Sequence, residues 1–182
     1  MKKILIISLL ILLKNNYAQE IRIGFRAEIF APLYDKTEIG KTFAPNPIPP
    51  NVYFVLAIKP ANIFQLDLRS GISFVENYGG FEFGGYLKYF PNESIYLLAA
   101  YNLHFMGGEA HGTHSNNETT FTICGFGVGF VTGKYSSIEF LLFFPSPKEW
   151  QYDVEVEIGG YKSITTKFIA ILKIGFGFDW PI

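Results

Sequence analysis

The residues best suited to chemistry lie in one glycine-rich segment, residues 107–118, with the sequence GGEAHGTHSNNE. It holds two of the three histidines of the chain and two acids. Imidazole and carboxylate groups together suit zinc and related metals, so Glu109, His111 and His114 could form a metal site. Nothing in such a loop fixes these side chains in place, and solvated polar residues are the simpler interpretation. We therefore predict no metal site and no cofactor.

The same segment contains the one arrangement that could supply a nucleophile, His114-Ser115-Asn116. A nucleophilic serine needs a histidine within hydrogen-bond reach and a carboxylate that orients this histidine. Adjacent side chains of an extended chain point to opposite sides, so His114 and Ser115 would meet only in a special turn. The sequence thus predicts no catalytic residue. A hydrolase that uses His111, His114 and Ser115 stays as an alternative.

The elements that must position these residues are β-strands, because apolar side chains recur at every second position along most of the chain. In residues 20–30 the odd-numbered side chains are apolar and most even-numbered ones are charged. Successive strand side chains point to opposite faces, whereas a helix would scatter these charges around its circumference. The alternation recurs over residues 63–75 and 167–180. Five further segments fit it less strictly: residues 51–59, 81–90, 95–106, 119–131 and 137–144.

The eight segments differ in how cleanly they alternate, and the terminal segment and residues 95–106 are the two extremes. The terminal segment places seven apolar side chains on one face: Phe168, Ala170, Leu172, Ile174, Phe176, Phe178 and Trp180. Residues 95–106 are less regular, since Leu98 and Ala100 share a face with Asn102 and His104. The terminal segment thus has one uniform apolar face, whereas residues 95–106 mix apolar and polar side chains on one face.

The connections between the segments alternate in length. Long connections are expected at residues 31–50, 76–80, 107–118 and 145–165, with short turns rich in Pro, Asn and Gly between them. An up-and-down antiparallel sheet with loops at one end and turns at the other explains this alternation. Eight such strands can close into a barrel and leave no free edge.

Periodicity alone leaves open which face of the barrel is inside, so a soluble ligand-binding barrel and a membrane barrel both fit. One face is large and uniformly apolar, whereas the other mixes glycines with charges of both signs. A water-facing exterior usually carries many Lys, Glu and Thr residues, while the narrow lumen of an eight-stranded barrel needs small residues and paired polar ones. We therefore predict an all-β fold, an eight-stranded antiparallel up-and-down transmembrane β-barrel.

The polar face then becomes the lumen. Isolated charges in so confined a space are costly, so we expect these side chains to pair with one another. The predicted ion-pair network has nine members: Arg22, Arg26, Glu28, Asp67, Arg69, Glu82, Lys88, Glu139 and Lys173. We also place Lys59, Lys167 and Asp179 on this face. A lumen filled in this way disfavours a narrow pore.

Residues 1–18 have the features of a secretory signal peptide: a basic start, a ten-residue apolar stretch from Ile4 to Leu13, and Ala18 before the expected cut. The mature barrel domain is then residues 19–182.

Cleavage removes three lysines and leaves 12 basic and 16 acidic residues, a net charge of −4, which argues against nucleic acid as a partner. The composition, 49% hydrophobic and 17% charged, excludes a disordered chain, and the single cysteine excludes an internal disulfide.

The last strand, KFIAILKIGFGFDWPI, gives the pattern its most specific element. The chain resembles the small eight-stranded outer-membrane barrels typified by OmpA and OmpX, and Ile174, Phe176, Phe178 and Trp180 match the phase of that family's C-terminal assembly signal. The family usually ends in an aromatic residue, where this chain ends in Pro181-Ile182. The resemblance implies insertion into the outer membrane of a Gram-negative bacterium by the barrel-assembly machinery, contact with outer-membrane lipids, and loops that meet a partner outside. It does not imply an enzyme.

A second resemblance concerns the histidine loop. His114-Ser115-Asn116 is distantly similar to the His-x-Ser-Asn pattern of the outer-membrane lipid A deacylases, but the intervening residue is absent here. Two alternatives to a structural and surface-interaction barrel therefore stand: a lipid-modifying barrel enzyme and a soluble periplasmic ligand-binding barrel.

Overall fold

The structure, a computed structural model, describes residues 20–37, 46–75, 78–106, 120–156 and 160–182. The signal segment and the histidine loop, with His111, His114 and Ser115, lie outside these ranges. Nearly all described residues are in nine β-strands: β1 (Glu20–Thr37), β2 (Asn46–Ala61), β3 (Phe64–Val75), β4 (Tyr78–Tyr89), β5 (Ile95–Met106), β6 (Thr120–Val131), β7 (Ser136–Ser146), β8 (Glu149–Val156) and β9 (Gly160–Pro181). No described segment forms a helix long and apolar enough to cross a bilayer.

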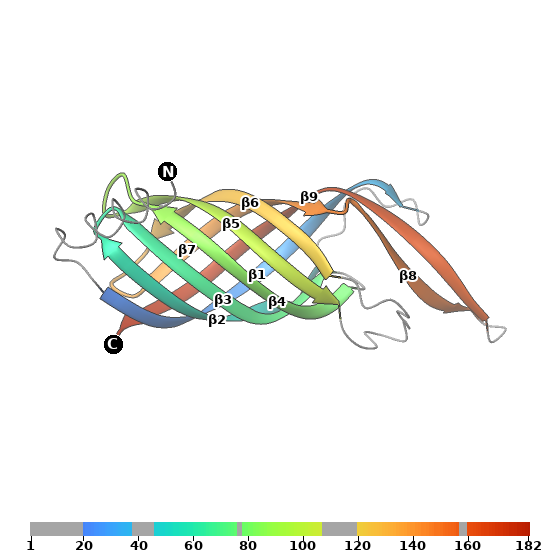
Figure 1. The fold of residues 1–182 in the computed structure, drawn as a ribbon, viewed down its shortest axis with the longest axis horizontal. Helices are drawn as coiled ribbons and strands as arrows, with labels where there is room; N and C mark the ends of the chain where they lie inside the picture. Colours follow the sequence, from blue (N-terminus) through green and yellow to red (C-terminus); the bar gives the residue numbers. More distant parts are fainter. Residues whose placement is uncertain (1–19, 38–45, 76–77, 107–119, 157–159) are drawn as a thin grey trace, which may run out of the picture.

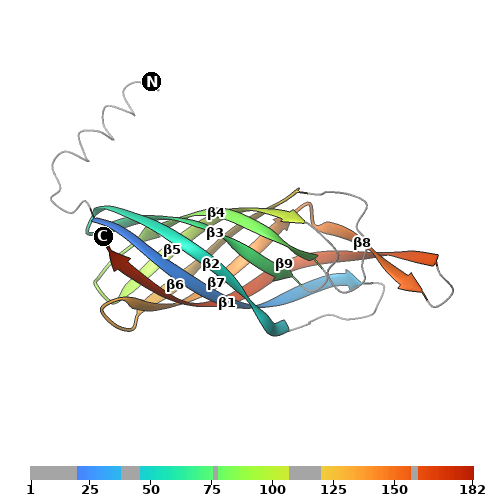
Figure 2. The same cartoon turned by 90° about the horizontal axis from the view of Figure 1, so that it is seen from below.

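The strands form one closed antiparallel barrel (Figures 1 and 2). Each strand from β1 to β7 pairs with the next, and β9 pairs with both β7 and β1, which closes the sheet. β7 and β8 both pair with β9: β7 pairs with residues 171–178 of β9, and β8 pairs with residues 160–167. They are two parts of one barrel position, so the predicted eight-stranded antiparallel barrel is confirmed.

Several strands are longer than the alternation predicts. β1 continues to Thr37 and β2 starts at Asn46, so the long connection expected at residues 31–50 is mostly strand. Beyond Phe30, β1 pairs with β9 alone among the described residues. Pro32 lies in this part of β1, where one side of the strand has no described neighbour and a missing N–H group costs little.

The connection expected at residues 145–165 also contains strand. β8 and the first part of β9 form a hairpin that extends past the rim of the barrel (Figure 1). The break between β7 and β8 falls at Pro147 and Lys148. Proline cannot donate a ladder hydrogen bond, so a strand interruption at this point is expected.

The turns at the other end of the barrel are short and held by local hydrogen bonds. In the turn between β4 and β5 the Asn92 side-chain oxygen accepts hydrogen bonds from the backbone N–H groups of Ser94 and Ile95, both at 2.9 Å. Asparagine favours turns because its side chain satisfies such backbone donors. The chain terminus lies at the same end, where the Ile182 N–H donates to the carbonyl oxygen of Ile21 at 3.0 Å.

The face assignment is wrong at the start of β9. Phe168 and Ala170 are buried inside, although the alternation places them on the outer face with Leu172. The pairing with β1 shifts between Leu33 and Tyr34, and Ala170 and Ile171 are both buried next to each other. The shift reverses the phase of β9 above this point, because one extra residue in a strand exchanges its two faces.

Candidate functional site

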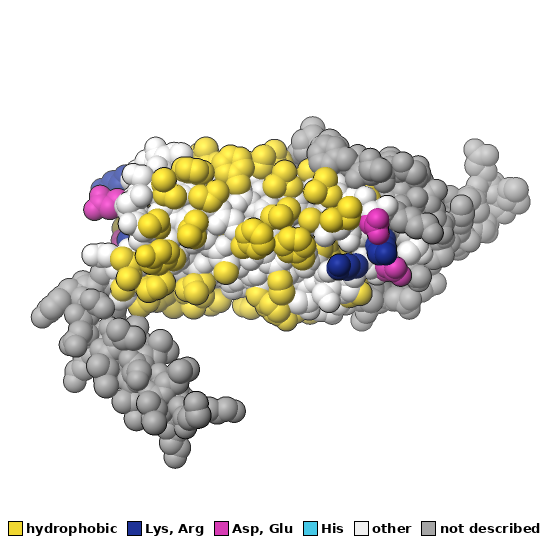
Figure 3. Space-filling view, turned by 90° about the horizontal axis from the view of Figure 1, so that it is seen from above, with side chains coloured by type: hydrophobic (Ala, Val, Ile, Leu, Met, Phe, Trp, Pro, Cys, Tyr) yellow, Lys and Arg dark blue, Asp and Glu magenta, His cyan; other side chains and the backbone are white. Residues whose placement is uncertain are grey.

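The exterior of the barrel is apolar all along its middle (Figure 3). Large apolar side chains are half exposed on every side, for example Ile72 at 55% and Phe126 at 58%. The charged side chains visible in this view lie near the two ends of the barrel. This is the reverse of a soluble protein, and it matches a surface that contacts lipid chains. The strands thus span a bilayer, with their backbone groups paired around the closed sheet.

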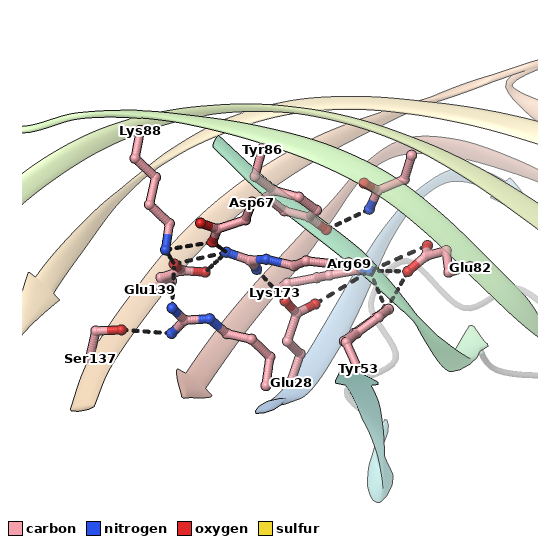
Figure 4. A network of polar contacts seen from close by, with 12 residues as sticks. Glu28, Tyr53, Asp67, Arg69, Glu82, Tyr86, Lys88, Ser137, Glu139 and Lys173 are labelled. Atoms are coloured by element: carbon pink, nitrogen blue, oxygen red, sulfur yellow. Dashed lines mark hydrogen bonds and ion pairs between the residues drawn. The ribbon is translucent and has the colours of Figure 1, made fainter. Parts of the chain in front are cut away.

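The lumen contains the opposite set of residues. Its centre is Glu139 on β7, a carboxylate with no exposed surface (Figure 4). Three cations surround it: Arg69 at 2.8 Å, Lys88 at 3.1 Å and Arg26 at 3.4 Å. The Tyr96 hydroxyl also donates a hydrogen bond to it at 2.8 Å. Four strands are thereby joined through one side chain, since these partners come from β1, β3, β4 and β5.

Arg69 extends the network across the barrel. Its guanidinium contacts Glu28 at 3.1 Å and Asp67 at 3.2 Å in addition to Glu139. It also lies over the Tyr86 ring, 3.7 Å from the ring centroid. A planar guanidinium with several donors suits this position, because it satisfies three carboxylates while its face stacks on an aromatic ring.

A second group of contacts lies around Lys173 on β9. The ammonium is 3.0 Å from Glu82, 3.1 Å from the Tyr53 hydroxyl and 3.5 Å from Glu28. Tyr53 in turn donates a hydrogen bond to Glu82 (Figure 4). His104 lies next to this group, with its Nδ1 atom 3.8 Å from Glu82. Glu28 contacts both Lys173 and Arg69, so the two groups form one continuous network.

The buried charges of the described lumen nearly balance. Every one has an opposite charge within 4.0 Å; the four cations are Arg26, Arg69, Lys88 and Lys173, and the five acids are Glu28, Asp67, Glu82, Glu139 and Asp179. Removing one partner from such a set would leave a buried charge without compensation, which is far costlier than the pair itself is stabilising. The arrangement holds strands in place. The described residues contain no group of three or more His, Cys, Asp and Glu side chains placed to hold a metal ion.

Glycines on the inner face make room for this network. A Cβ atom at Gly177 would collide with the Arg26 guanidinium, and one at Gly129 would collide with the Tyr96 ring. The close approach of a strand backbone to a large side chain is a position that only glycine fits.

Above the ionic network, toward the long connections, the lumen becomes aromatic. Trp150 from β8 is fully buried and stacks on Phe121, with ring centroids 3.9 Å apart. The ring centroid of Phe168 lies 4.6 Å from that of Trp150, and the ring centroid of Tyr34 lies 5.1 Å from that of Phe168. The His104 ring stacks on Trp150 from below at 5.9 Å. We call this set, Tyr34, His104, Phe121, Trp150 and Phe168, the aromatic layer.

The structure brings eight of the nine predicted network residues together. Arg22 is the exception, because it lies near the turn end and pairs with Glu20 at 2.8 Å, where both side chains are partly exposed. Asp179 is in the lumen and contacts Arg26 at 2.9 Å. Lys59 and Lys167 are only partly buried, and Lys167 pairs with exposed Asp35 at 3.2 Å. Lys167 lies above the phase shift in β9, which explains its wrong assignment.

The residues of the predicted assembly signal all lie on the outer face. Ile174, Phe176, Phe178 and Trp180 alternate with buried neighbours, and the Phe178 and Trp180 rings stack with centroids 5.9 Å apart. Strand periodicity finds these positions directly.

The neutral members of the site are not found by charge counting. Each buried one completes a hydrogen bond in the network: Tyr53, Gln65, Tyr86, Tyr96, Asn102 and Ser137. Tyr53, Gln65, Tyr86 and Ser137 share the inner face of their strands with charged residues, and that shared phase is the signal that could have found them. Tyr96 and Asn102 lie on β5, which carries no Asp, Glu, Lys or Arg, so this signal is absent there. Trp150 carries no such signal, because it follows the break between β7 and β8.

No protein-family model matches the sequence, and no curated protein is similar to it. Several solved structures, including the following three, are similar in fold. The N-terminal β-barrel domain of Pseudomonas aeruginosa OprF is 13% identical, with 88% of this chain and 100% of that chain covered and a TM-score of 0.43. The outer membrane protein OprG from Pseudomonas aeruginosa is 11% identical, with 91% and 97% covered and a TM-score of 0.44. Ail, the attachment invasion locus protein of Yersinia pestis, is 12% identical, with 89% and 97% covered and a TM-score of 0.37. At such identities and scores, the function of this chain has to be inferred from its own geometry.

Proposed function

We propose that the protein is an integral outer-membrane β-barrel with a structural and surface-interaction role, and that it conducts no solute. The observation that carries this proposal is the placement of charged side chains inside and apolar side chains outside, the reverse of a water-soluble protein. Buried carboxylates and guanidinium groups fill the centre, while phenylalanine and isoleucine side chains cover the exterior. A water-soluble carrier barrel would need a polar exterior and an apolar cavity.

The outer membrane is the proposed location because closed barrels are the β-structures that bilayers accept, and the chain combines such a barrel with an expected secretory signal. The alternating terminal strand is the proposed contact with the barrel-assembly machinery. Outer-membrane lipids would then cover the apolar belt. The hairpin of β8 and β9, together with the other long connections, would face outward and offer the surface for an extracellular partner.

The absence of conduction follows from packing. Glu139, Arg69, Lys88 and Arg26 lie together inside the barrel, and none of the four side chains is more than 2% exposed. An ion that entered would have to break several charge-assisted hydrogen bonds at once, each stronger than a neutral hydrogen bond. Planar-bilayer recording of the purified protein tests this directly: we expect no steady channel openings, and a stable unitary conductance would contradict the proposal.

Location is tested by cell fractionation followed by electrophoresis with and without boiling. A folded small barrel should sediment with the outer membrane and migrate differently before and after heating. A soluble periplasmic protein with no heat-dependent shift would contradict the proposal. Phe178→Asp offers a matched variant, because a charge on the lipid face of the terminal strand should reduce the folded fraction. The control Lys134→Asp lies in an exposed turn and should leave that fraction unchanged.

We propose no catalytic role for the histidine loop. Its residues lie outside the described part of the chain, and in an extended chain the adjacent side chains of His114 and Ser115 point to opposite sides. The lipid-modifying alternative is tested by expressing the chain and its His114→Ala/Ser115→Ala variant and comparing the acyl chains of lipid A. Unchanged lipid in both cases supports the structural role. A change that depends on these two residues would make the protein an enzyme.

A further inference from the structure

The aromatic layer closes one end of the lumen through a residue that does not belong to the barrel wall. Trp150 is the second residue of β8, at the base of the projecting hairpin. Its indole N–H donates a hydrogen bond to the Pro147 carbonyl oxygen at 2.8 Å, which fixes the ring where the chain leaves β7. The ring then reaches back over the lumen and is fully buried between Phe121 and Phe168.

A group of polar side chains lies next to Trp150 inside the lumen. His104 stacks against the indole with an interplanar angle of 19°, and its Nδ1 faces Glu82 on β4. Lys173 on β9 and Tyr53 on β2 complete this group. A single aromatic layer therefore separates a cluster of charges from the loop side of the barrel.

The turn end of the same lumen is built differently. A pocket of about 50 Å³ opens there, lined among others by Arg22, Lys88, Tyr96, Ser137 and Asp179. Its lining mixes charged and hydroxyl groups with apolar side chains and reaches the edge of the ionic network at Lys88 and Asp179. A space of this size holds a few water molecules. At the turn end a small pocket thus leads toward the ionic network, and at the loop end the aromatic layer covers it.

We infer that Trp150 is a plug that keeps external water and reagents away from the His104, Glu82 and Lys173 group, so that the lumen is sealed at the loop end by the base of the outer hairpin. This inference goes beyond the proposed function and does not depend on which membrane holds the barrel. The rings of Tyr34, Phe168, Trp150 and Phe121 follow one another across the lumen, with centroids 3.9 to 5.1 Å apart, and an apolar layer of this kind disfavours water above the charges. Truncation of the central ring removes the only member of the aromatic layer that β8 contributes.

The test uses His104 as the reporter. Asparagine substitution of His111 and His114 leaves His104 as the sole imidazole of the chain, because the chain has three histidines. The reagent is diethylpyrocarbonate, applied to the folded protein in detergent, and the modification of His104 is followed by peptide mass spectrometry. In this parent protein we expect slow modification. Trp150→Ala should raise the rate about tenfold or more, because local opening no longer has to displace the indole.

Two matched variants separate a plug from general loosening. Trp150→Phe retains an aromatic ring in the stack and should keep His104 protected. Trp180→Ala removes the other tryptophan, which lies on the lipid face, and should leave the rate unchanged. An unchanged rate in Trp150→Ala, or an equal rise in Trp180→Ala, would overturn the inference. Heat-dependent gel mobility establishes that each variant is folded, and it also keeps a failure of the barrel itself distinct from a failure of the plug.

A second measurement leaves the plug intact. In Trp180→Phe the only indole is Trp150, so its fluorescence reports the seal without truncating it. We expect weak quenching by iodide, at least about tenfold below that of free tryptophan, and no quenching by lipids with brominated acyl chains. Strong iodide quenching would show that Trp150 is exposed to water and would overturn the inference even if Trp150→Ala does not fold.

Discussion

The two halves of the lumen are filled by different kinds of contact: buried ion pairs in one half and stacked aromatic rings in the other. The ionic network takes side chains from seven strands, β1, β2, β3, β4, β5, β7 and β9, and each contact fixes both a distance and a direction. The aromatic layer takes rings from β1, β5, β6, β8 and β9 and depends on shape. Charge pairing holds the strands together in one half of the lumen, and in the other half, by our inference, stacked rings keep water out. The following substitutions test this division, starting with the largest expected effect.

Glu139→Gln should have the largest effect. The substitution keeps the shape of the side chain but leaves Arg26, Arg69 and Lys88 with one carboxylate fewer inside the barrel. Removing one partner of a buried ion group costs about 3 to 5 kcal/mol. Urea unfolding of the barrel in lipid vesicles, followed by tryptophan fluorescence, measures this. A loss below about 1 kcal/mol would mean that the network contributes little.

Phe121→Ala should be the next most damaging change, and for another reason. Phe121 is buried and its ring centroid lies 3.9 Å from that of Trp150, so truncation leaves a cavity in the aromatic layer. Large-to-small changes of this kind cost about 3 to 4 kcal/mol. Phe121→Leu is the matched control and should cost less, because most of the volume stays. Equal losses for both variants would show that stacking geometry, and not volume, stabilises this half.

Gly177→Ala should cost about 1 to 3 kcal/mol, because the added methyl collides with the Arg26 guanidinium, which contacts Ser137 and Asp179. Gly85→Ala is the control, since its Cβ would meet nothing within 4 Å. We expect that control to stay within about 0.5 kcal/mol of the wild type. The same unfolding assay applies, and a control that is as damaging as Gly177→Ala would show that strand propensity dominates over the collision.

Arg22→Ala should have the smallest effect. Its pair with Glu20 is partly exposed at the turn end, and such pairs contribute less than about 1 kcal/mol. The loss should shrink further at high salt, because exposed charges are screened. A loss of unfolding free energy as large as that of Glu139→Gln would contradict this prediction, because it would mean that Arg22 stabilises the barrel as much as the buried network does.

Much of the fold follows from the sequence because strand alternation is a local property. Ile174, Phe176 and Phe178 show it without interruption, and each lies on the outer face. The charges of the lumen share the opposite phase, so eight network residues could be named in advance. The pairing partners could not, because the contact between Glu139 on β7 and Lys88 on β4 depends on closure of the sheet.

The aromatic layer could not be predicted for a different physical reason. The shift between Leu33 and Tyr34 reverses the faces of β9, so Phe168 has the phase of a lipid-facing residue in the sequence and lies inside in the structure. Leu98 and Ala100, which share a face with Asn102 and His104, were the visible sign that the lumen is partly apolar. Trp150 follows a strand break, and periodicity assigns no face to a residue in that position.

The central claim, that the apolar face meets lipid and the charged face is enclosed, is tested most directly at Phe126. This residue is the most exposed of the large apolar side chains on β6, at 58%. A nitroxide spin label at Phe126→Cys, in a Cys124→Ala background and reconstituted in lipid, should be relaxed more by oxygen, which dissolves in acyl chains, than by a water-soluble nickel chelate. Stronger relaxation by the nickel chelate would put this face in water and contradict the transmembrane assignment.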